Sequence, residues 1–314
     1  MIKNYLLIFF KIVLIFGSLL MALPVLPQEP KIFTRSDFDL TGPVKTCRVI
    51  TDYGKEDFEF NNEGLLTKSV TRYSQNDYDV SYYKYQEQRL VERRAERYQD
   101  GKFDEITSMA HFYSYDSLPQ TKITERILSY NKDFQEQYEY FYNKAGQLIT
   151  MRRSHAEGLD ETQLDYSIYK DESTVSYMLN GLLQKSVRTS VKKQKNGEEL
   201  KIELIKYFIE GVPEKATERT LNSKGLLVSE LNFSYSKKEK SFVPLTKKVF
   251  SYDERDKLES VTSTFGKLID TEEYLYQFDD NDGGNWVKKI ISPENSYTTR
   301  VIEYYDPVRT PERP

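Results

Sequence analysis

The sequence predicts an all-β protein: an elongated antiparallel meander of about eight degenerate β-hairpin units behind an N-terminal signal or anchor helix. Three observations predict this class: abundant aromatic residues, a recurring turn motif, and alternation of apolar and charged residues beside that motif. Of 314 residues, 25 are Tyr and 17 are Phe, and aromatic side chains favour pleated, half-buried surfaces. Beyond the N-terminal apolar run, no long segment shows a capped helical face.

Residues 1–28 have the pattern of an export signal, a basic start followed by a long apolar run. Lys3 supplies the positive charge at the start. The alternative is an uncleaved membrane anchor over residues 5–26, a run long enough to cross a bilayer of about 30 Å. Lys11 interrupts that run and favours a signal peptide that is cleaved.

The rest of the chain divides into a lead-in at 29–44, a hairpin domain at 45–306 and a tail at 307–314. The tail is rich in proline and charge, so we expect it to be disordered. Cys47 is the only cysteine, which excludes an internal disulfide. It lies in an alternating segment typical of a strand, and we expect a buried structural thiol.

A turn motif recurs through 45–306, with its best copy, YNKAGQL, at residues 142–148. Asn143 suits the first position of a type I turn, where its side chain can bond to backbone two residues on. Gly146 then takes the left-handed conformation that closes a common hairpin loop. We expect structural turns, with no ligand required, at Asn61, Gly64, Asn143, Gly146, Asn222, Gly225, Asp253, Asp256 and Gly284.

Extended strands are predicted on both sides of these turns. Tyr138, Tyr140 and Tyr142 precede one turn at a spacing of two, which places their rings on one face of a sheet. Alternating apolar and charged residues follow the turns, as at 121–130. A shared aromatic face is therefore expected to hold the hairpins together, with Trp286 capping the end of that core.

These units resemble the YD-repeat, or RHS-repeat, proteins of bacteria, whose units run Tyr-x-Tyr-Asp-x-x-Gly-x-Leu. The resemblance lies in residues 140–148 and 250–253, and in the final block YLYQFDDNDGGNWVKKI with the strand TTRVIEYYD after it. That block is similar to the last unit of short exported members from Bacteroidetes-like bacteria. The resemblance implies stacked hairpins without a toxin domain and a location in the periplasm, on the outer surface or outside a Gram-negative cell. It implies no settled activity.

The sequence contains no recognisable catalytic, cofactor or metal motif. Its two histidines lie far apart, and it lacks nucleotide-binding and nucleophile signatures. The acidic stretch at 279–285 fails as a calcium loop because Ile290 stands where the bidentate carboxylate is required. We therefore expect no catalytic residues, no cofactor and no metal, and the ligand-binding residues are unknown.

The leading hypothesis is a non-enzymatic exported protein of the cell envelope or surface, a hairpin scaffold for protein interaction. The alternatives are a carbohydrate- or lipid-binding module that uses an aromatic sheet face, and a hydrolase with an unrecognised site. The partner is then an unknown protein or glycan of the envelope. A net charge of −4 disfavours nucleic acid, and membrane contact is expected only through residues 5–26 if they are retained.

Overall fold

The computed structural model describes residues 30–117, 121–280 and 284–306. The expected signal or anchor at 1–28 and the expected tail at 307–314 lie outside these ranges. Within them the chain forms twenty β-strands and one short 3-10 helix, η1 (Arg35–Phe38). Helices in the described ranges fall short of the length and hydropathy needed to cross a membrane.

The strands follow one another through short turns. They are β1 (Val44–Thr51), β2 (Gly54–Phe60), β3 (Leu66–Arg72), β4 (Tyr78–Gln86), β5 (Arg89–Gln99), β6 (Lys102–Asp116), β7 (Lys122–Ser129), β8 (Phe134–Tyr142), β9 (Leu148–His155), β10 (Gly158–Tyr169), β11 (Glu172–Leu179), β12 (Leu182–Lys193), β13 (Glu199–Ile209), β14 (Val212–Leu221), β15 (Leu227–Ser236), β16 (Ser241–Tyr252), β17 (Leu258–Phe265), β18 (Leu268–Phe278), β19 (Trp286–Ser292) and β20 (Ser296–Tyr304).

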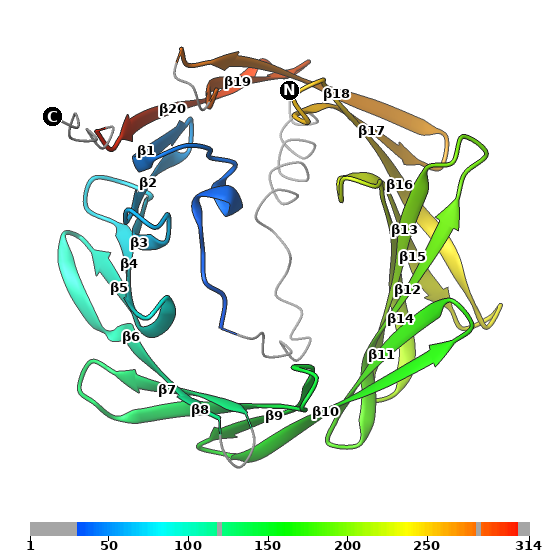
Figure 1. The fold of residues 1–314 in the computed structure, drawn as a ribbon, viewed down its shortest axis with the longest axis horizontal. Helices are drawn as coiled ribbons and strands as arrows, with labels where there is room; N and C mark the ends of the chain where they lie inside the picture. The colour runs from blue at the N-terminus through cyan, green and yellow to red at the C-terminus, as the bar shows by residue number, and fades with distance from the viewer. Residues whose placement is uncertain (1–29, 118–120, 281–283, 307–314) are drawn as a thin grey trace, which may run out of the picture.

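The strands form one closed antiparallel barrel (Figure 1). Every strand pairs with the next in sequence. The last strand then pairs with the first, with Ile302 opposite Cys47 and Arg300 opposite Val49. Twenty strands at a spacing of about 4.8 Å and a tilt of about 40° give a barrel about 40 Å across.

The protein is all-β, but the expected elongated meander of about eight units is wrong, because β20 pairs with β1 and leaves no open array. The expected resemblance to YD-repeat proteins is wrong for the same reason, because the hairpins form a closed ring and not a stacked array. Alternation and turn residues specify each hairpin locally. Closure depends on strand tilt and twist accumulated over the whole sheet, and on pairing between opposite ends of the chain. A local sequence pattern predicts neither the accumulated tilt and twist nor the pairing of the two ends.

The two faces of the wall are told apart by the segment 34–43, which contains η1 and lies inside the ring (Figure 1). The ring of Phe38 packs on that of Phe58 of β2, with centroids 4.4 Å apart. Phe58 and its strand-pairing partner Cys47 therefore face inward. Following this alternation through the strand register around the barrel assigns every wall residue to an inner or an outer face.

Two packed clusters of core residues lie on the inner face. The first joins Leu40 of the inner segment to Val44, Cys47, Phe60 and Leu66. The second, on β8–β10, contains Tyr140, Tyr142, Leu148, Met151 and Leu164. The tyrosines that sequence spacing placed on one face are thus on one face, and it is the concave side of the wall.

The outer face of β1–β10 carries cross-strand ion pairs. Lys68 Nζ lies 2.9 Å from Glu59 Oε1, and Arg152 Nε lies 2.7 Å from Glu161 Oε2. The outer face of β13–β20 is more apolar, with partly or largely exposed side chains at Leu204, Val249, Leu275, Tyr297 and Val301. The exterior therefore has a strongly charged sector and a more apolar sector that still carries outward lysines such as Lys247 and Lys288.

Candidate functional site

The inner segment enters the barrel along β1–β3. Thr34 forms an isolated bridge with Leu65, and its backbone N–H donates to Asp37 Oδ2 at 2.8 Å, which helps to start η1. The Arg35 guanidinium donates to the carbonyl oxygens of Val44 and Asn61, each at 2.7 Å. These bonds fix the segment to the inner face of the first strands.

The same segment is also bonded to the last strands. Trp286 Nε1 on β19 donates to Asp39 Oδ2 at 2.8 Å, and Arg300 Nη2 on β20 donates to the carbonyl of Phe38 at 2.8 Å. The Asp39 carboxylate also pairs with Lys257, from the turn between β16 and β17. The segment therefore bridges the strands that close the barrel.

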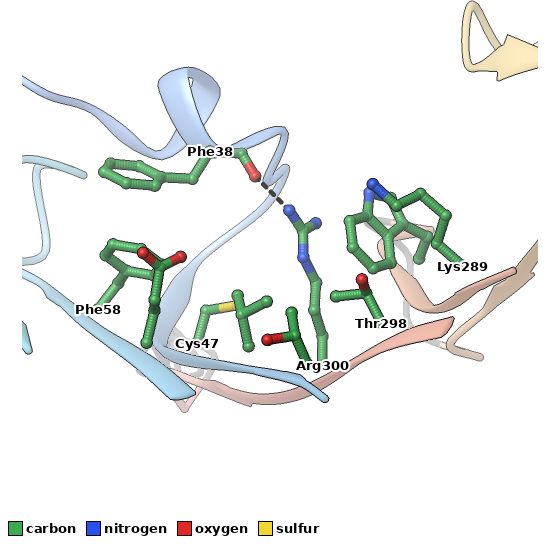
Figure 2. A pocket seen from close by; sticks show the side chains of 10 residues that line it. Phe38, Cys47, Phe58, Lys289, Thr298 and Arg300 are labelled. Carbon is green, nitrogen blue, oxygen red and sulfur yellow. Dashed lines mark hydrogen bonds between the residues drawn. The ribbon is translucent and has the colours of Figure 1, made fainter. Parts of the chain in front are cut away.

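A pocket of about 280 Å³ lies between η1 and this part of the wall (Figure 2). One side is apolar and includes Phe38, Val49 and Phe58. The other side, from β19 and β20, presents Lys289 and Arg300. The pocket thus combines aromatic surface with two cations inside the barrel.

Both cations lie against Trp286. The Arg300 guanidinium carbon is 3.5 Å from the indole centroid and the Lys289 ammonium 5.4 Å from it, within the range of cation–π attraction. Burial lowers the pKa of each group, and the positive charge of Arg300 further lowers the pKa of Lys289. The Asp39 carboxylate opposes both shifts without reversing them. No carboxylate of the described chain lies within ion-pair distance of either cation.

Two further titratable groups line the pocket. Glu56 of β2 is half-buried, and burial raises the pKa of its carboxyl. Cys47 is buried, as its sequence context predicts. Burial raises the pKa of its thiol to about 11, so the thiol stays protonated at neutral pH and is a poor nucleophile.

A separate polar cluster is buried on the inner face of β6–β8. Glu125 Oε1 lies 2.7 Å from His111 Nδ1 and accepts a 2.9 Å hydrogen bond from the Tyr113 hydroxyl. Tyr140 OH donates to the other carboxylate oxygen at 3.3 Å. Burial alone raises the pKa of Glu125, but these bonds outweigh it and the net shift is downward. The hydrogen bonds of the cluster satisfy the buried charge of Glu125.

The turn residues singled out from the sequence follow even-numbered strands, so they lie together on one rim. Asn143 Oδ1 accepts from the backbone N–H groups of Ala145 and Gln147, each at 2.9 Å. Gly146 has a φ of +76°. Equivalent bonds or left-handed conformations occur at Asn61, Gly64, Asn222, Gly225, Asp253 and Asp256. These residues shape the rim and lie outside the pocket.

Gly284 and Trp286 occur where β18 connects to β19. Gly284 has a φ of +55°, and Trp286, 5% exposed, packs against Tyr276 and the inner segment. Sequence reasoning missed Lys289, Arg300 and Glu56. Alternation from Trp286 does not select Lys289, because the strand register shifts between Trp286 and Lys288. The proximity of the three residues depends on the β1–β20 pairing. Among the described residues, no His, Cys, Asp and Glu side chains group as a metal site.

Solved structures of low sequence identity are similar to this chain. No protein-family model matches the chain, and no curated protein matches it. A porin-like protein from Bacteroides uniformis covers 84% of this chain and 99% of its own, at 11% identity and a TM-score of 0.32. One from Bacteroides vulgatus has the same coverage, 10% identity and a TM-score of 0.25. Scores this low decide nothing, and the barrel is established by the chain's own strand pairing.

Proposed function

We propose that the protein is an exported, non-enzymatic barrel of porin-like architecture that works through its lumen, holding or passing a small solute. The observation that carries the proposal is the pairing of β20 with β1, which closes a wall of twenty strands. Barrels of about 8 strands are filled by their own side chains, whereas those of about 16 to 18 strands leave an aqueous channel.

The inner face of β12–β16 supports a hydrated lumen. Polar side chains face inward there and remain partly exposed: Lys185, Glu203, Thr217, Asn232 and Lys248. The aromatic cluster lines the other side of the lumen, on β8–β10. A glycan or lipid that uses the aromatic face would therefore have to enter the barrel.

The charged outer sector favours water or another protein as its surroundings. An Arg or Lys on the lipid-facing side of a membrane barrel costs about 2–4 kcal/mol near the bilayer midplane. Lys68, Arg72, Arg94 and Arg152 all lie on the outer face of this sector. We therefore propose an aqueous compartment of the envelope, reached through the predicted signal at residues 1–28.

A pore in the outer membrane is the second candidate. A closed barrel leaves no strand edge unpaired, which is a condition for spanning a bilayer. The apolar outer sector on β13–β20, including Leu204, Val249 and Leu275, supplies lipid-compatible surface on that side. The two candidates differ in what surrounds the outer face, and both use the lumen.

Neighbouring lysines on β16 test the lumen and its surroundings together. Lys248 faces inward and Lys247 outward. Lys248→Cys and Lys247→Cys are made separately in a Cys47→Ser background, expressed with the native N-terminus in a Gram-negative host, and labelled with maleimides of increasing polymer size. The proposal predicts that both react with the smallest reagent and that only Lys247→Cys reacts with the largest.

Equal labelling of the two variants at every reagent size would contradict a lumen. Fractionation of the same cells shows which compartment contains the protein. The aqueous proposal predicts that the protein is released without detergent. A detergent-requiring protein whose Lys247→Cys thiol is shielded from water-soluble reagents, and which makes liposomes permeable to sugars, would establish the outer-membrane pore instead.

A further inference from the structure

We propose that the pocket between η1 and β19–β20 binds a small organic anion, a carboxylate carried on an aromatic body. The inference deepens the proposed function, because it rests on the lumen as the working compartment and names the class of solute. It is carried by the two cations, by the absence of a direct ion pair to either of them among the described residues, and by the aromatic wall opposite them.

The cations are placed close together by the strand register. Lys289 pairs with Thr298, and Arg300 is the next inward residue on β20. Figure 2 shows both side chains on the same side of the pocket. Two like charges beside one indole repel each other, so an anion between them gains from both. The Asp39 carboxylate attracts both cations from a distance, but its direct bonds are to Trp286 and Lys257.

One of the hydrogen-bond donors of Arg300 is also unused. Its Nε is buried and has no hydrogen-bond partner in the described structure, whereas its Nη groups donate to the carbonyls of Phe38 and Asp39. A buried donor without an acceptor is unfavourable. Because Nε is buried, a ligand oxygen reaches it only after a shift of the Arg300 side chain. A carboxylate accepts from guanidinium more strongly than a neutral carbonyl does.

The charge of the pocket limits the ligand to a monoanion. Glu56 on β2 and Arg300 on β20 both pair with Val49 of β1, from opposite sides. The carboxyl and the guanidinium therefore lie on the two strands that flank β1. Lys289, Arg300 and Lys257 set against Glu56 and Asp39 leave a single positive charge. A dianion would meet repulsion from Glu56 without a further cation to compensate it.

The remaining wall selects an apolar body. Phe38 and Phe58 line the side opposite the cations, and a hydrated inorganic anion gains nothing from this apolar wall. The volume of about 280 Å³ lies just below the range of about 300–1,000 Å³ for small-molecule sites, which limits the ligand to a small body. Phenylacetate, which joins one aromatic ring to one carboxylate, is therefore a suitable probe.

The experiment measures binding of phenylacetate to the full-length protein by calorimetry and by fluorescence. Trp286 is the only tryptophan, so its emission reports on this pocket alone. The inference predicts saturable binding of phenylacetate that changes the emission, with phenylacetamide and inorganic phosphate each binding at least about tenfold more weakly. Equal binding of the acid and the amide, or no saturable binding of the acid, would overturn it.

Matched variants of β19 localise the binding. Lys289→Gln is predicted to weaken phenylacetate binding at least about tenfold, whereas Lys288→Gln, on the adjacent outward-facing residue, leaves it unchanged. Equal affinity in both variants would overturn the assignment to this pocket. The maleimide test on Lys248 uses no ligand and tests the lumen independently. If that test confirms the lumen and phenylacetate does not bind, only the inference about the pocket is overturned.

Discussion

Trp286 Nε1 donates a 2.8 Å hydrogen bond to Asp39 Oδ2, and this bond joins the start of β19 to the segment inside the barrel. Arg300 lies over the same indole and donates to the carbonyl of the preceding residue, Phe38. The first and last parts of the described chain therefore meet at one aromatic residue. The inner segment and the closing strands stabilise each other through it.

Trp286→Phe is expected to loosen this junction. The substitution removes the indole N–H and weakens the cation–π contact with Arg300, so the free energy of unfolding should fall by about 1–3 kcal/mol. Urea denaturation followed by circular dichroism measures this, and trypsin should cut sooner after Arg35. Tyr297→Phe, on the outer face of β20, is the control. Unchanged stability and cleavage in Trp286→Phe would contradict the junction.

The buried carboxylate on β7 predicts a pH dependence. The pKa of Glu125 is lowered in the folded protein, so its contribution is present above the ordinary pKa of 4.5 and is lost as pH falls through the lower folded value. Glu125→Gln should therefore lose about 1–3 kcal/mol of stability at pH 7. It should also lose less stability than the wild type as pH falls below about 4.5.

Denaturation midpoints measured across this pH range check the expectation. The matched control is Glu139→Gln. It removes an outward-facing carboxylate on β8 that pairs with Lys122 of β7, and should change stability by less than about 1 kcal/mol. Parallel pH curves for the wild type and Glu125→Gln would show that this carboxylate makes no such contribution.

The rim turns offer a test of backbone conformation alone. Gly146 has a φ of +76°, and a Cβ added there would meet nothing within 4 Å. Gly146→Ala should therefore cost about 1–2 kcal/mol, from the left-handed conformation only. Lys144→Ala in the same turn is the control. Thermal unfolding of the two variants compares them, and equal midpoints would contradict the turn geometry.

Local features of the fold were predictable because their causes are local. Asn143 and Gly146 specify a turn through hydrogen bonds and a φ angle within five residues of each other. The spacing of Tyr138 and Tyr140 likewise identified a shared face. Whether that face was concave could not be predicted, because alternation distinguishes two faces of a strand without saying which one a barrel encloses.

The closure and the pocket needed information that no segment contains. Lys289, Arg300 and Cys47 lie together only because β1 and β20 pair. In the sequence, Lys289 is one of two adjacent lysines, and nothing there separates it from its outward neighbour Lys288. The carboxyl end of the chain also resembled a repeat terminus, although its strands complete a ring.

The most direct test of the account is a disulfide across the closing pair of strands. Arg48 and Val301 are Cα partners on the outer faces of β1 and β20, at a separation of about 4.5–5.5 Å that suits a disulfide. In a Cys47→Ser background, Arg48→Cys with Val301→Cys should oxidise to an intramolecular crosslink, whereas Arg48→Cys with Leu204→Cys should not. If the first pair stays reduced while each thiol reacts with maleimide, the two ends of the sheet are apart and the barrel is not closed.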